Sequence, residues 1–215
     1  MKKRLQAALE DKDFSELLKK GGVSFLFRIA GQIIGFLLTL LIAYKFNAEG
    51  LGEYLLIVVV LKIFSLFAKV GLDTATIRFT ASFAIQNKWE TLQQFFKKIN
   101  FVLLITSIFF SSLMFILSDK IGTLLPLDEQ LIKLFSFFIL PTVFFAFYYQ
   151  SLRGLKKIAA FSFFYRMSQV LFTLIILGIL LQFDHEKDMI FYAYLLSLVI
   201  VSLLAYLTFK KALKK

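Results

Sequence analysis

Residues 23–44 read VSFLFRIAGQIIGFLLTLLIAY, an apolar run of 22 residues whose only charge is Arg28. A bilayer core about 30 Å thick is crossed by about 20 apolar residues of helix. The run follows a charged leader of 22 residues, is too long for the apolar segment of a signal peptide, and lacks a small-x-small cleavage site. The stretch therefore predicts a transmembrane helix.

Five further apolar runs complete the pattern, at 51–70, 99–117, 131–150, 158–182 and 189–209. They are continuous rather than alternating, which disfavours the strands of a β-barrel. The chain is 59% hydrophobic and contains 28 Phe in 215 residues, which is well above the apolar share of soluble domains. We expect an all-α integral membrane protein with a leader at 1–22, a lobe of six transmembrane helices at 23–209 and a basic tail at 210–215.

The basic residues are divided unequally between the two sides of these helices. Seventeen Lys and Arg fall in the leader, the second loop, the fourth loop and the tail, whereas four fall in the other loops. Because positive residues stay inside, both termini are predicted to be cytoplasmic. This asymmetry explains most of the net charge of +11, so no nucleic-acid partner is expected.

The second loop carries an apolar stripe. Ile85, Trp89, Leu92, Phe96 and Ile99 recur at helical spacing. This spacing predicts an amphipathic helix over about 82–98 that lies at the membrane surface.

Little catalytic chemistry is available in this composition. The absence of cysteine and the presence of one histidine exclude disulfides and thiolate metal sites. We expect no metal, no cofactor and no enzymatic activity.

Apart from Lys133 at the edge of the fourth run, four cations lie inside the expected spans: Arg28, Lys62, Lys69 and Arg166. A charge at this depth costs about 2.5–3.5 kcal/mol on insertion scales and is often functional. Gln32 follows Arg28 by one helical turn, and the six runs contain no Asp or Glu other than Glu53, the third residue of the second run. Each cation could extend singly to the cytoplasmic headgroups. We favour this interpretation for Lys69, which lies near the surface. For Arg28, Lys62 and Arg166 we favour a basic cavity, open to the cytoplasm, that accepts an anionic group.

Two backbone features bear on packing and movement. Gly31 and Gly35 form a small-xxx-small pair, which predicts close helix approach. Pro141 lies within the fourth run, where it should bend the helix. Both are common packing features, and a gating role for Pro141 is the less frequent alternative.

Several stretches resemble the N-terminal half of polysaccharide flippases of the multidrug/oligosaccharidyl-lipid/polysaccharide exporter superfamily. They are the Lys-Lys-Gly that ends the leader at 19–21, AYKFNAEGLGEY at 43–54, VGLDTATIRFTA at 70–81 and QSLRGLKK at 150–157. Each motif is degenerate, and the resemblance depends on their order and spacing around six spans. It covers essentially the whole chain.

The resemblance implies two lobes of six helices around a central cavity in the cytoplasmic (inner) membrane. Such flippases move polyprenyl-pyrophosphate-linked oligosaccharides to the outer leaflet by alternating access, and basic residues hold the pyrophosphate. The matching candidates are Arg28, Lys62 and Arg166, with Lys69 and Arg78 near the entrance and Gln32 beside them.

A complete family member would be roughly double the length. The chain is therefore expected to supply one lobe and to act with a second, either a missing C-terminal half or another chain. The alternatives are a multidrug antiporter of the same superfamily, disfavoured because no carboxylate lies deep within the expected spans, a membrane enzyme acting on polyprenyl-phosphate sugars, or a scaffold subunit.

Overall fold

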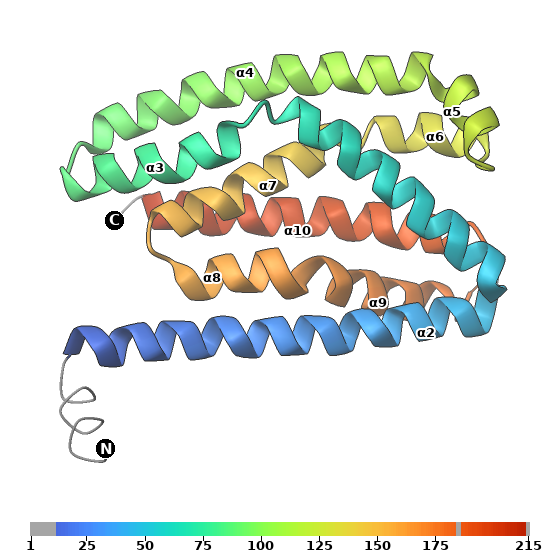
Figure 1. Cartoon of the computed structure of the whole chain (residues 1–215), viewed down its shortest axis with the longest axis horizontal. Coiled ribbons are helices and arrows are strands. Elements are labelled where there is room, and N and C mark those ends of the chain that lie inside the picture. Colours follow the sequence, from blue (N-terminus) through green and yellow to red (C-terminus); the bar gives the residue numbers. More distant parts are fainter. Residues whose placement is uncertain (1–11, 184–185, 214–215) are drawn as a thin grey trace.

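The computed structural model describes residues 12–183 and 186–213, with residues 12–20 as backbone only. The first part of the leader, the loop residues 184–185 and the last two residues of the tail lie outside the described residues. Every regular element of the described residues is a helix (Figure 1). The helices are α2 (Lys12–Ala68), α3 (Leu72–Ile85), α4 (Trp89–Ile116), α5 (Ser118–Leu124), α6 (Glu129–Ser136), α7 (Ile139–Gly154), α8 (Ile158–Phe163), the π-helix η1 (Phe164–Ser168), α9 (Gln169–Leu180) and α10 (Met189–Leu213).

The expectation of an all-α membrane protein agrees with this structure. By length and apolar composition, four helical stretches of the described residues could cross a membrane, or five if the bent pair α6 and α7 is one span. The four are Gly21–Ala68, Trp89–Ile116, Ile158–Leu180 and Met189–Leu213. Several such helices in one chain indicate a multi-pass membrane protein.

The two N-terminal runs lie in one helix, α2, which is kinked at Asn47 (φ 61°, ψ −177°). Figure 1 shows that α2 runs the length of the bundle to this point and then turns back across it. This pair of dihedral angles is almost confined to glycine and costs a residue with a Cβ about 1–3 kcal/mol. Asparagine is among the residues that tolerate positive φ best. The reversal between the two runs therefore depends on one strained residue.

The strain at Asn47 gives a testable expectation. Asn47→Gly should raise the free energy of unfolding by about 1 kcal/mol, whereas Asn47→Val should lower it by about 1–3 kcal/mol. Thermal unfolding of the detergent-solubilised protein measures both. Equal stability of the two variants would contradict the strained geometry.

The amphipathic helix expected over about 82–98 is divided in the structure. Helix α3 ends at Ile85 and α4 begins at Trp89, and Asn87 between them has φ 55°. Ile85 is 69% exposed, whereas Leu92 and Phe96 of α4 are buried. The apolar stripe therefore belongs to two helices, because Asn87 leaves the α-helical region and changes the direction of the chain.

The fourth run is bent, as Pro141 predicts. Helices α6 and α7 meet at 43°, and Pro141 is the third residue of α7. A proline ring displaces the carbonyl four residues earlier, here that of Phe137. The break falls at Phe137–Phe138 rather than at the proline, because a proline is tolerated in the first turn of the helix that follows the break.

The core lies where α10 packs against α7 and α9. Phe96, Phe147 and Phe209 bring α4, α7 and α10 together, with the rings of Phe96 and Phe209 4.8 Å apart. Gly154 of α7 is in close contact with α3, since a Cβ there would be 2.7 Å from Cβ of Thr80.

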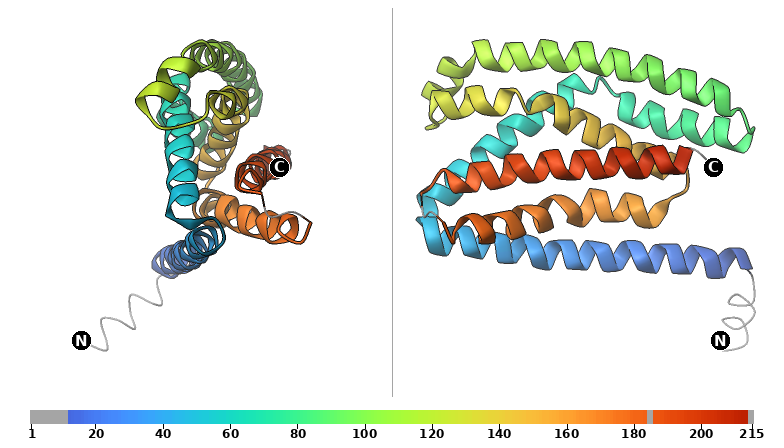
Figure 2. Two further views of the ribbon diagram at one scale, coloured as in Figure 1. Left: turned by 90° about the vertical axis from the view of Figure 1, so that its right-hand side faces the viewer. Right: turned by 180° about the vertical axis from the view of Figure 1, so that it is seen from behind.

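The two ends of the bundle carry different charges. Figures 1 and 2 show that the α3–α4 turn, the α7–α8 turn and the end of α10 gather at one end. The described Lys and Arg of these segments are Lys88, Lys97, Lys98, Arg153, Lys156, Lys157, Lys210 and Lys211. The α2 kink, α5, the start of α6 and the α9–α10 connection lie at the opposite end. Its described acids are Glu49, Glu53, Asp119, Asp128, Glu129, Glu186 and Asp188.

Candidate functional site

The contact between the first half of α2 and η1 positions two of the expected cations. Gly31 is buried, and a Cβ there would stand 2.9 Å from the carbonyl carbon of Arg166 and closer still to its oxygen. Ser24 and Ser162 share a hydrogen bond of 2.5 Å on the same contact. Arg28 lies one turn before Gly31 on α2, so Arg28 and Arg166 lie at similar heights in the bundle.

Lys62 lies on the second half of α2, which runs obliquely across the bundle and away from the first half (Figure 1). Arg28 precedes Asn47 by 19 residues and Lys62 follows it by 15, so at 1.5 Å per residue they lie about 28 and 22 Å along the helix from the kink. Arg28, Gln32 and Lys62 are exposed. Their side chains have no hydrogen-bond or ion-pair partner in the part of the chain that the structure describes. These cations therefore lack a protein carboxylate there.

Arg166 lies in the five-residue π-helix η1. A π-helical turn contains one residue more than an α-helical turn and is often found at functional sites. The guanidinium of Arg166 lies 4.5 Å from the ring centre of Tyr165, within the range of a cation–π interaction. Arg166 is exposed, so its charged group remains available to a ligand.

An aromatic trio, Tyr149, Phe161 and Tyr165, joins α7 to α8 and η1. Their ring centres are 5.3–6.1 Å apart. The guanidinium of Arg153 lies 5.3 Å from the ring of Phe161. The trio therefore contacts two arginines, Arg166 on η1 and Arg153 at the end of α7. Sequence reasoning missed this arrangement, because residues 149 and 165 lie on separate elements.

Lys69 differs from the other cations in having a partner. Its Nζ lies 3.5 Å from a carboxylate oxygen of Asp73, so the ion pair crosses the break at Gly71. The charge of Lys69 is therefore partly compensated.

Two further polar residues, Arg78 and Gln169, lie apart from these groups. Arg78 is exposed on α3 and lines an open pocket of about 480 Å³. Gln169 donates hydrogen bonds to Ser197 Oγ at 2.8 Å and to the Tyr194 carbonyl at 3.3 Å. It therefore faces α10, and it does not extend the exposed polar surface of Arg166.

Within the described residues, the structure holds no group of three or more acids and histidines that could bind a metal ion. What the arrangement offers is exposed guanidinium and ammonium groups on membrane-length helices. Such groups bind phosphate oxygens through charge-assisted hydrogen bonds.

No protein-family profile, curated protein or solved structure matches this chain.

Proposed function

We propose that the chain is one lobe of a flippase that carries a polyprenyl-pyrophosphate-linked oligosaccharide across the cytoplasmic membrane for polysaccharide biosynthesis. The pyrophosphate binds a basic surface formed by Arg28, Lys62 and Arg166. The protein transports its substrate by alternating access and does not transform it chemically. A second six-helix lobe supplies the other wall of the cavity.

The proposed topology has six spans. They are the two halves of α2, helix α4, the bent pair α6–α7, the continuous helix from α8 through η1 to α9, and α10. The reversal of α2 at Asn47 supports the division of that helix into two spans. The gathering of basic turns at one end supports a cytoplasmic location of that end and of both termini.

One observation carries the proposal: Arg28, Lys62 and Arg166 are exposed on membrane-length helices and have no carboxylate partner in the described residues. A cation in lipid without a partner is costly. A water-filled cavity with an anionic substrate removes this cost. A pyrophosphate offers several oxygens to both guanidinium and ammonium donors.

The neighbouring groups fit the same substrate. The ring of Tyr165 holds the Arg166 guanidinium from one side, which limits the rotamer freedom lost when the arginine binds phosphate. Lys69 and Arg78 lie farther toward the basic end and would attract the anion before it reaches the deeper cations.

The experiment replaces Lys62 and Arg166 with Gln, singly and together, in the protein expressed in its own cells. Each single change removes a charged hydrogen-bond donor, so export of lipid-linked sugar should fall at least about tenfold. Lys120→Gln, a matched change of an exposed lysine at the acidic end, should leave export unchanged.

The amount of each variant in the membrane is measured as well. A normal amount shows that a fall in export is due to lost transport and not to failed insertion. Unchanged sugar export in the double variant would overturn the proposal. Unchanged sugar export together with lost drug resistance would favour a multidrug antiporter instead.

A further inference from the structure

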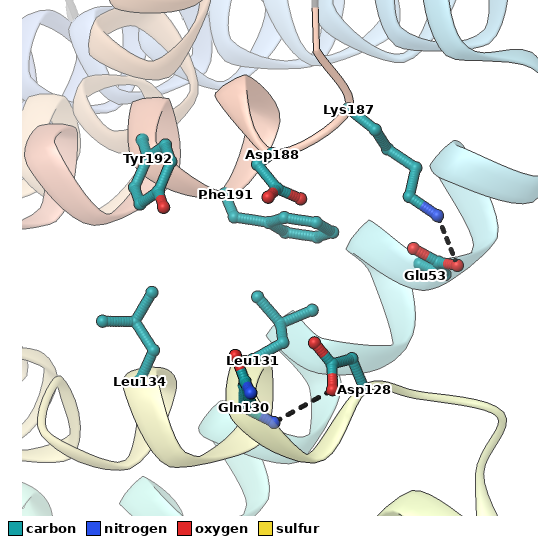
Figure 3. A pocket seen from close by; sticks show the side chains of 9 residues that line it. All are labelled: Glu53, Asp128, Gln130, Leu131, Leu134, Lys187, Asp188, Phe191 and Tyr192. Carbon is teal, nitrogen blue, oxygen red and sulfur yellow. Dashed lines mark hydrogen bonds and ion pairs between the residues drawn. The ribbon is translucent and has the colours of Figure 1, made fainter.

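A pocket at the acidic end of the bundle is separate from the basic surface. It has a volume of about 400 Å³ and lies between α6, the first turn of α10 and the start of the second half of α2. Figure 3 shows the side chains that surround it. The volume falls in the range of ligand pockets, which is about 300–1,000 Å³.

The lining of this pocket is divided into an apolar and a charged part. Figure 3 shows Leu134 and Tyr192 on one side, away from the ion pair of Lys187 and Glu53 on the other. Leu131 and Phe191 lie between them, next to Asp128 and Asp188. A ligand that fills this pocket must therefore be apolar at one end and polar at the other.

The charged part is acidic. Lys187 Nζ lies 2.8 Å from Glu53 Oε1, so these two charges compensate each other. The hydrogen bond to Glu53 raises the pKa of Lys187 above its ordinary value, which keeps the ammonium charged. Asp128 and Asp188 then supply the excess negative charge of the lining.

Both aspartates are held by the helices that follow them. Asp128 Oδ1 accepts a hydrogen bond of 3.1 Å from the backbone N–H of Gln130. The carbonyl of Asp188 accepts hydrogen bonds from the N–H groups of Phe191 and Tyr192, at 3.0 and 3.1 Å. This fixes the backbone of both residues, and the carboxylate of Asp188 is not used in these bonds. It remains available to a cation in the pocket.

We propose that this pocket binds a membrane lipid with a primary ammonium headgroup, of the phosphatidylethanolamine class. The ammonium donates hydrogen bonds to Asp188 and Asp128, and an acyl chain lies against Leu131, Leu134 and Tyr192. A quaternary choline headgroup has no N–H to donate, and an anionic glycerol headgroup is repelled by the carboxylates. The site is independent of the flippase assignment, because it uses none of the basic residues.

The test purifies the full chain and exposes it to an equimolar mixture of dioleoyl phosphatidylethanolamine, phosphatidylcholine and phosphatidylglycerol. The lipids retained after delipidating washes are counted by native mass spectrometry. Phosphatidylethanolamine should be enriched over both others. Asp188→Asn should reduce its retention about tenfold, as expected for a lost hydrogen bond between charged groups.

Asp119→Asn is the matched control, because Asp119 is an exposed aspartate at the same end that does not line the pocket. It should retain the lipid as the unchanged chain does. Equal melting temperatures of the two variants show that folding is not the cause of a difference. Equal retention of the three lipids, preference for phosphatidylglycerol, or equal behaviour of the two variants would overturn the proposal.

Discussion

Gly31→Ala is expected to destabilise the protein by about 1–3 kcal/mol. The added methyl group would overlap the carbonyl of Arg166, and neither backbone can move away without separating α2 from η1. The side chains of Arg28 and Arg166 would then lose their common placement. We therefore expect a lower melting temperature in detergent and weaker binding of anionic lipid by the same variant.

Gly35→Ala provides the matched control, one turn farther along the same helix. A Cβ at Gly35 would have no neighbour within 4 Å. Alanine is the better helix former, so this variant should be as stable as the original chain or more stable by up to about 1 kcal/mol. Equal destabilisation by the two substitutions would contradict the close contact at Gly31.

The helices could be predicted from the sequence because apolar runs of membrane length are an unambiguous signal. Every expected run is mostly helical in the structure, and the bend before Pro141 follows from proline geometry. The turn at Gln86–Lys88 could not be predicted in this way. The spacing from Ile85 to Ile99 is helical throughout, and only the backbone angles of Asn87 reveal that the chain breaks there.

The candidate site was partly predictable. The cations could be found because charges in apolar runs are rare, and Gly31 could be found from its spacing to Gly35. Gly31 alone makes the expected close contact. The π-helix at Arg166 leaves no composition signal. The ion pair between Lys69 and Asp73 joins residues only four apart, so their spacing allows it, although the chain breaks at Gly71 between them.

The central claim is that the surface beside Lys62 faces water and accepts a pyrophosphate, although most of its surroundings are apolar. The chain contains no cysteine, so a single introduced thiol is a unique label. Leu66 lies one turn after Lys62 and is 59% exposed, while Leu207 on α10 is 57% exposed. Leu66 follows Asn47 by 19 residues and Leu207 follows Met189 by 18, so the two leucines lie similarly far along helices that start at the acidic end.

The decisive measurement compares the rates at which Leu66→Cys and Leu207→Cys react with a membrane-impermeant maleimide in lipid vesicles. The thiolate is the reactive species and forms only where water reaches it. The account predicts rapid labelling at position 66, slowed by undecaprenyl pyrophosphate, and very slow labelling at position 207. Labelling at position 66 as slow as at position 207, or unaffected by the pyrophosphate lipid, would contradict it.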